Sequence, residues 1–357
     1  MKIDITDPLR AFSHSPGHEA MIPFSYCKVK AFPSALEISS SLSEEKKCFF
    51  WNFTGPVIPF TVEQDLERNC LRIYGEAKQG YFRFIIRKEE TSILLHVEKT
   101  PVEGIFLLNE DGAFERVLFS GEKIHLITDG TSSKGAIEER LFLGNSKHKD
   151  WDLIRKRRDL TEILPLWFAL GQMAPAFPSE DGPVIDLLSQ AEKRVLAKDR
   201  SVNEELLNLY LAGFSGGLVP RSLDLEFQGI LPLSSSIDMS AVTLLKRGAT
   251  LIRSLFFQEQ ESSYYILPCL PSQFVSGKML GIKTENGCKI DLEWTKHKMR
   301  RMTVLVEKEG SFQAVFPSEI KECRLKMSFK DRGRILKNGE VILVAPGQRL
   351  WIDRFQK

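Results

Sequence analysis

Short apolar runs separated by turn residues fill the chain from Phe24 to about Leu143. They recur every ~8 to 12 residues, a spacing typical of the antiparallel strands of a sandwich. Asp111-Gly112 stands between two of the runs, where it favours a hairpin turn. We predict strands over residues 48–53, 71–74, 81–87, 93–97, 105–108, 115–119 and 123–128.

Between residues 150 and 260 the apolar positions follow the helical period. Asp150 and Ser201 are predicted N-caps, and Glu204 completes a capping box with Ser201. Pro165 and Pro183 each suit the start of a helix, where a missing backbone N–H costs nothing. We predict helices over residues 151–163, 166–173, 184–197, 201–211 and 238–260, and a loop over 213–236.

After residue 264 the chain returns to short strands, with turn residues at Asn338-Gly339 and Pro346-Gly347. We predict these strands over residues 289–294, 302–307, 311–316, 324–328, 341–345 and 349–352. The patterns predict an α+β fold with an N-terminal antiparallel β-sandwich, a reduced helical middle and a C-terminal β-sandwich domain. The expected bounds of these parts are residues 1–149, 150–261 and 262–357.

The composition is that of a folded soluble protein, with 43% hydrophobic and 27% charged residues in a chain of 357. Its 49 basic and 47 acidic residues give no indication of a nucleic-acid partner. The longest apolar run, around residues 163–170, is too short for a membrane span. Because the first residues contain no apolar core of a signal peptide, we expect a cytoplasmic location, or export by a route without a signal peptide.

The 6 cysteines form no C-x-x-C pair and have no zinc-type spacing with histidine. We therefore expect a reducing compartment rather than an oxidising one. His14 and His18 are four residues apart, but Pro16-Gly17 interrupts any helix that would align them as metal ligands. No metal and no cofactor is predicted.

The most distinctive motif of the chain follows the last predicted helix. Its prolines force extended backbone at the residues before them, and its final acidic residues alternate with apolar ones, as on a strand with one buried face. The motif consists of Leu267-Pro268-Cys269-Leu270-Pro271, then Gly277, Gly281 and Gly287, then Asp291-Leu292-Glu293-Trp294. We interpret Asp291 and Glu293 as a solvated or turn-stabilising strand face.

In one ungapped register from Gly248 to about Met299, this stretch resembles the C-terminal end of family-95-type glycoside hydrolases, the α-L-fucosidases and their relatives. The family pattern runs LLPALP, G-x-x-G-L, a GG turn and VDIEW. The resemblance covers about one seventh of the chain. It implies the last helix of a catalytic barrel followed by a C-terminal β-domain.

The resemblance also implies where catalysis would be found, and this chain differs there. In the family, an (α/α)6 barrel carries a general acid and a water-activating Asp, the Asp within an FQIDGNFG motif. The same register puts Thr243 at that Asp, Leu245 at the Asn, and Leu244 and Arg247 at the glycines. A twelve-helix barrel needs roughly 300 residues, whereas the interval from 150 to 261 offers about 110.

Other carboxylates are weak catalytic candidates. Asp224 and Glu226 lie in the Gly/Pro-rich loop, where sites often occur. The alternative interpretation is that both carboxylates belong to a solvated loop. Asp238 reaches the position of the family's Asp only through a gap, and it also suits the N-cap of the last helix.

Tryptophans are candidates for stacking against sugar rings. Trp151, at a helix start among charged residues, is the best candidate for an exposed ligand-binding platform. Trp51 and Trp167 have apolar neighbours typical of the core. The basic run Arg155-Lys156-Arg157-Arg158 is interpreted as a solvated helix face.

Three functional hypotheses follow. The first is a non-catalytic relative of family-95-type glycosidases that binds a carbohydrate or a protein partner. The second is a divergent glycoside hydrolase with relocated carboxylates. The third is a protein–protein interaction or effector scaffold without sugar affinity. Fold analogy alone cannot separate them, because one scaffold hosts many functions.

Overall fold

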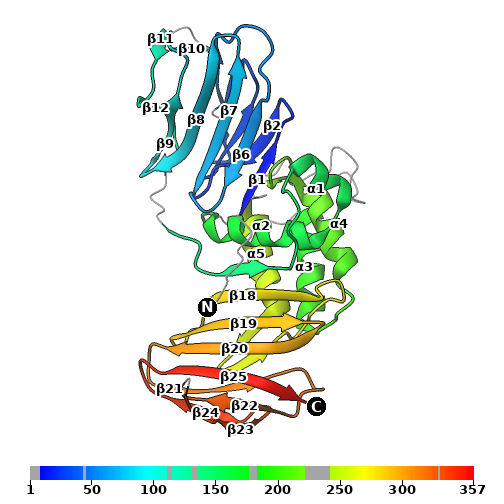
Figure 1. Ribbon diagram of the computed structural model, residues 1–357. Helices are drawn as coiled ribbons and strands as arrows, with labels where there is room; N and C mark the ends of the chain where they lie inside the picture. The colour runs from blue at the N-terminus through cyan, green and yellow to red at the C-terminus, as the bar shows by residue number, and fades with distance from the viewer. Residues whose placement is uncertain are drawn as a thin grey trace.

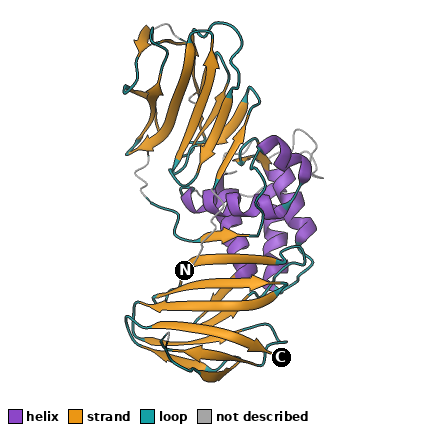
Figure 2. Ribbon diagram, in the orientation of Figure 1, coloured by secondary structure: helices purple, strands orange, loops and turns teal. Residues whose placement is uncertain are grey.

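The computed structural model describes residues 9–42, 46–110, 115–130, 135–176, 183–221, 242–328 and 330–357. Two blocks of β-sheet lie at opposite ends of the molecule, and the helices lie between them (Figures 1 and 2). The predicted α+β class with β-rich ends is confirmed.

The N-terminal block consists of two 6-stranded antiparallel sheets. The first has the order β1 (Arg10–Ser13), β6 (Thr61–Asp65), β7 (Cys70–Ala77), β8 (Gly80–Glu89), β9 (Ser92–Lys99) and β12 (Lys123–Thr128). The second has the order β11 (Glu115–Leu118), β10 (Ile105–Asn109), β5 (Lys46–Trp51), β4 (Ala35–Ser40), β3 (Cys27–Ala31) and β2 (His18–Met21).

Aromatic side chains from both sheets form the core of this sandwich. The ring of Trp51 lies 5.0 Å from that of Phe84, and Phe53 stacks on Phe82 at 4.0 Å. Trp51 is 5% exposed, which confirms it as a core residue. The strands predicted in this region are confirmed, and β10 pairs antiparallel with β11 as the hairpin requires, although the turn at 111–114 lies outside the described residues.

The helices of the described ranges are α1 (Trp151–Arg157), α2 (Leu160–Met173), α3 (Pro183–Leu196), α4 (Asn203–Gly213) and α5 (Val242–Phe256). Asp150 caps α1, as predicted, because its carboxylate accepts hydrogen bonds from the first-turn N–H groups. The break between the first two helices was predicted at Pro165 but lies at Arg158, which is left-handed (φ 53°). Asp159 caps α2, and Pro165 lies inside this helix.

Two other helix ends differ from the prediction. Ser201 does not cap α4, because its backbone N–H and its hydroxyl both donate to the carboxylate of Asp199. Val202 is the N-cap and makes no side-chain cap bond. The last helix ends at Phe256 instead of residue 260, because the next residues pair as a strand. Pro183 opens α3 as predicted.

Helices α2 and α5 approach closely at two glycines. A Cβ on Gly171 would lie 2.2 Å from the carbonyl oxygen of Leu245, and one on Gly248 would lie 2.2 Å from the ring of Trp167. Both distances are far below van der Waals contact, so the pair packs with its backbones close together. Trp167 is fully buried there, as predicted.

The C-terminal block consists of a 7-stranded and a 4-stranded sheet. The first has the order β13 (Arg140–Phe142), β18 (Ser276–Lys283), β19 (Cys288–Thr295), β20 (Lys298–Val306), β25 (Arg349–Gln356), β22 (Glu322–Lys326) and β23 (Arg334–Lys337). The second has the order β16 (Phe257–Gln260), β17 (Ser263–Ile266), β21 (Gly310–Val315) and β24 (Val341–Val344). The predicted strands are confirmed, whereas β13, β16, β17, β18 and β23 were not predicted.

One buried cluster runs from the helices into both C-terminal sheets. Trp294 of β19 stacks on Phe256 at the end of α5, with ring centroids 5.2 Å apart, and its indole N–H donates to the carbonyl of Phe274. Helix α5 and the C-terminal sandwich therefore share a core, and the domain bounds at 149/150 and 261/262 stay predictions. Within the described ranges, no helix is long and apolar enough to cross a membrane.

Asp291 of the motif has the turn-stabilising role expected of it. The carboxylate of Asp291 accepts hydrogen bonds from the backbone N–H of Gly281 (2.9 Å) and the hydroxyl of Thr303 (3.1 Å). Gly281 has φ 75°, and a Cβ there would lie 2.5 Å from the carbonyl oxygen of Glu138. Asp291 thus fixes an irregular step in β18 that only glycine fits.

Candidate functional site

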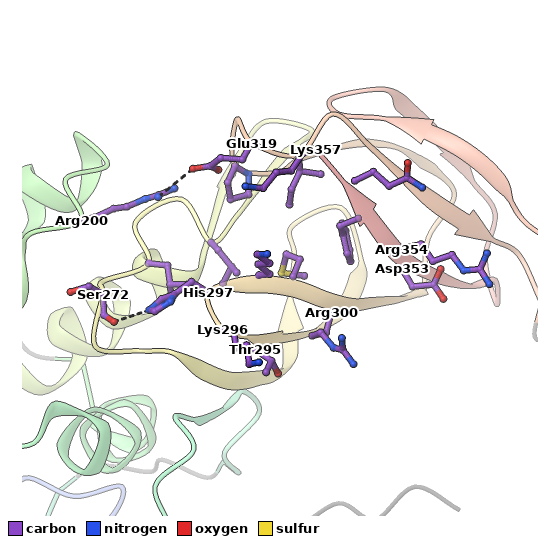
Figure 3. Close-up of a pocket in the computed structure, with 18 residues that line it drawn as sticks. Arg200, Ser272, Thr295, Lys296, His297, Arg300, Glu319, Asp353, Arg354 and Lys357 are labelled. Atoms are coloured by element: carbon purple, nitrogen blue, oxygen red, sulfur yellow. Dashed lines mark hydrogen bonds and ion pairs between the residues drawn. The ribbon is translucent and has the colours of Figure 1, made fainter.

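A cavity of about 1000 Å³ lies beside the C-terminal sandwich, next to the β19–β20 turn and the end of β25 (Figure 3). Its size is at the upper end of the ~300–1,000 Å³ common for ligand pockets. The lining residues are Arg200, Leu267, Leu270, Ser272, Thr295, Lys296, His297, Lys298, Met299, Arg300, Pro317, Glu319, Ile320, Asp353, Arg354, Phe355, Gln356 and Lys357.

The distinctive proline motif builds part of the apolar floor. Leu267 follows β17 in a left-handed conformation (φ 50°), and its N–H donates to the carbonyl of Phe256 (2.8 Å). Cys269 N–H donates to the carbonyl of Leu255 (3.3 Å). The segment therefore wraps around the end of α5, and Leu267 and Leu270 face the cavity. The motif that carries the family resemblance has a structural role in shaping this cavity.

The turn between β19 and β20 places a basic pair at the cavity. Lys296 and His297 both have positive φ, 53° and 58°, the geometry of a two-residue hairpin turn that usually favours Asn-Gly. His297 is fixed there, because its backbone N–H donates to the carbonyl of Val275 (2.9 Å) and its ring Nε2 donates to the carbonyl of Ser272 (2.7 Å).

The end of β25 supplies the opposite wall. Its register against β22 shifts between Glu322 and Arg324, and Arg354 is left-handed (φ 53°) at this irregularity. The carboxylate of Asp353 receives two hydrogen bonds from the Arg324 guanidinium, both 2.7 Å, and this pairing lowers the pKa of Asp353. The adjacent Phe355 packs edge-on against Phe316, 5.1 Å between ring centroids.

Positive charge dominates the lining. We call Arg200, Lys296, Lys298, Arg300, Arg354 and Lys357 the cationic rim. The lining carboxylates in the described part of the chain are Glu319 and Asp353. Glu319 lies 3.7 Å from Arg200, an ion pair visible in Figure 3, and Asp353 is held by Arg324.

Both carboxylates that line the cavity in the described part of the chain are engaged by arginines. A glycosidase needs a carboxylic acid with a raised pKa and a second carboxylate across the scissile bond. The pKa of Asp353 is shifted in the opposite direction, and Glu319 already faces a guanidinium. The rim offers hydrogen-bond donors above an apolar floor, which suits recognition of a polar ligand with an apolar face.

The predicted site residues fall elsewhere. Asp224, Glu226 and Asp238 lie outside the described residues, so their roles stay predictions. Trp151 was expected to be exposed, and the structure corrects this, because its side chain is 1% exposed. The first turn of α1 is pinned against β1, where Phe12 N–H donates to the carbonyl of Lys149 (2.9 Å), so the indole faces the core.

The residues that the predicted register aligned with the family's catalytic motif take part in helix packing in this structure. Leu244 and Leu245 are buried, and Thr243 is 6% exposed. Arg247 pairs with Glu192 of α3 at 2.6 Å. These side chains join α5 to its neighbours and present no carboxylate.

Comparison with known proteins agrees with the geometry. Residues 258–340 match the family model described as glycoside hydrolase family 95, C-terminal domain. The matched interval runs from β16 to beyond β23, which confirms the resemblance from residue 258 onward and extends it past Met299. It contains the proline motif and the Lys296-His297 turn but neither Arg200 nor the end of β25. No curated protein sequence matches the chain.

Sequence reasoning missed the cationic rim. The only local signal was the basic run that contains Lys296, Lys298 and Arg300, directly after the recognised strand. Arg200, Arg354 and Lys357 stand in separate polar segments whose convergence no local pattern indicates.

Proposed function

We propose that this protein is a non-catalytic, glycoside-hydrolase-like protein that binds carbohydrate in the cavity beside its C-terminal sandwich. The observation that carries the proposal is the combination of an apolar floor, a rim of donors and two carboxylates already engaged by arginines. Pyranose rings present one apolar face and several hydroxyls, and such a surface complements them. The match to a glycoside-hydrolase C-terminal domain supports a sugar as the ligand class.

The test is a glycan array with full-length protein, followed by calorimetry and mass spectrometry of the captured sugars. Thr295 is exposed and lines the cavity, so Thr295→Trp should fill the site and reduce affinity at least tenfold. Thr250 is exposed on α5 and does not line the cavity, which makes Thr250→Trp the matched control. Equal affinities of the two variants would place sugar binding elsewhere.

A divergent hydrolase is the second hypothesis from the sequence, and its candidate acids are Asp224, Glu226 and Asp238. Turnover would appear as a mass change in the captured glycan. In that case Asp224→Asn, Glu226→Gln and Asp238→Asn are expected to identify the acid by loss of turnover at an unchanged melting temperature. Turnover that survives all three substitutions would refute these assignments.

A protein partner remains the alternative ligand, and one surface favours it. Edge strand β24 exposes Val341 (49%) and Leu343 (76%), and the other C-terminal sheet ends in β23 with Ile335 65% exposed. Exposed apolar groups on edge strands are typical of interaction surfaces. A stable complex lost on Leu343→Lys, together with an empty glycan array, would favour this interaction function.

A further inference from the structure

The cavity carries an excess of positive charge that neutral sugars do not require. Six lining residues are Lys or Arg and two are acidic. Among the residues that the structure describes, Lys296, Lys298, Arg300, Arg354 and Lys357 have no ion-pair partner. Uncompensated cations that converge on one cavity raise the local concentration of anionic ligands.

The two acids lining the cavity contribute little counter-charge. Asp353 is neutralised by the two hydrogen bonds from Arg324, which does not itself line the cavity. Glu319 faces Arg200 across the opening at 3.7 Å. Both carboxylates are therefore engaged first by an arginine other than Arg300 and Arg354, although Asp353 also attracts the neighbouring Arg354.

The backbone fixes part of the rim in place. Lys296 and Arg354 both occupy the left-handed region, which costs a non-glycine residue roughly 1–2 kcal/mol. His297, anchored to Ser272 and Val275, holds the turn that carries Lys296. The cations are thus presented by a rigid turn and a strand irregularity rather than by a flexible loop, which lowers the entropy lost on binding.

We propose that the cavity selects acidic glycans, meaning oligosaccharides that carry carboxylates or sulfate esters, over neutral ones. This inference rests on the proposed carbohydrate-binding function. Guanidinium groups bind carboxylates and sulfates through two parallel hydrogen bonds, and Arg300 and Arg354 supply such groups on neighbouring strands. The apolar floor accepts the ring face, and the rim accepts the anion.

The experiment compares matched ligands by titration calorimetry. The probes are a trigalacturonate and its methyl ester, and a sulfated disaccharide with its unsulfated counterpart. We expect the charged member of at least one pair to bind at least tenfold more tightly, and its affinity to fall as NaCl rises from 50 to 500 mM. The pair that responds identifies carboxylate or sulfate as the anion.

Charge variants distinguish an effect of the cationic rim on ligand binding from a general loss of folding. Arg300→Gln should weaken binding of the acidic probe about tenfold. Glu319→Gln should tighten it about threefold, and a gain of affinity cannot come from misfolding. Arg332 is exposed on the same sandwich but does not line the cavity, so Arg332→Gln is the matched control.

The outcomes distinguish this inference from the function on which it rests. Equal binding of charged and neutral probes, with Thr295→Trp still inhibitory, overturns acidic selectivity and leaves sugar binding intact. No binding of any probe at millimolar concentration overturns both. Acidic selectivity that Arg300→Gln and Glu319→Gln leave unchanged refutes the assignment of the anion site to this cavity.

Discussion

His18 is expected to make the protein acid-labile in a pH range above that in which most carboxylates titrate. It lies on β2 with 8% of its surface exposed, next to Asp152 and Arg155 of α1. Burial lowers the pKa of His18 from 6.5 to about 4, and the nearby Asp152 only partly opposes this shift. The imidazole of His18 is therefore neutral in the folded protein.

The sign of the effect follows from proton binding. Between pH 6.5 and 4 the unfolded chain binds a proton at His18 that the folded chain excludes, so stability falls as pH falls. Linkage gives a loss of about 1.4 kcal/mol at pH 5.5 and about 2.5 kcal/mol at pH 4.5. Above pH 6.5 this contribution is fully present.

Urea unfolding at pH 7.5, 6.5, 5.5 and 4.5 measures this loss, with His18→Asn as the non-titrating control. The pKa values of Asp199 and Asp353 are lowered in the folded protein, so these groups change the stability only below their normal pKa values near 4. That range lies outside the upper part of the pH series. Burial raises the pKa of Glu259, which adds stability on acidification and so opposes the His18 effect. Parallel losses in the native protein and His18→Asn between pH 6.5 and 5.5 would refute the assignment.

Four further substitutions, one of them a control, test packing, a buried ion pair and the exposure of a thiol. Gly248→Ala should cost about 1–3 kcal/mol by overpacking against the α2 indole, whereas Gly310→Ala, with nothing within 4 Å of the new Cβ, should be near neutral in urea unfolding. Asp129→Ala should cost about 3–5 kcal/mol, because it removes the carboxylate that pairs with the buried ammonium of Lys88; an unchanged unfolding midpoint would contradict this. Cys48, the only half-buried cysteine in the described ranges, should account for the first native thiol to react with Ellman's reagent, and Cys48→Ser should abolish that phase.

Local sequence signals were sufficient where the partner of a residue lies within a few positions. Asp150 caps α1 through N–H groups two and three residues away, and Pro183 opens α3 because a first helical position needs no N–H. Alternating apolar residues located most of the longer strands for the same reason, because one face of each strand is buried; β18 is the exception among the strands of eight residues or more. The predicted capping box at Ser201 is wrong, because the N–H and the hydroxyl of Ser201 both donate to Asp199, two residues earlier.

Contacts between distant segments decided the rest. Nothing near Trp151 in the sequence indicates that β1 covers it, and nothing near Phe257 indicates that the chain leaves the helix to pair with Ile266. The resemblance to a glycoside-hydrolase C-terminal domain identified the proline motif, but only the fold showed that this motif forms a cavity floor.

The sequence alone determined the α+β architecture and the two β-rich ends. The tertiary structure decided which charged residues line one cavity. In the sequence, nothing distinguishes Arg200, Arg300 and Arg354 from other solvated arginines. A charged side chain is compatible with its local segment wherever that segment lies on the surface. Only the folded chain brings these charges together above one apolar floor. The strength of an electrostatic interaction depends on the distance in space between the charges and not on their separation in the sequence.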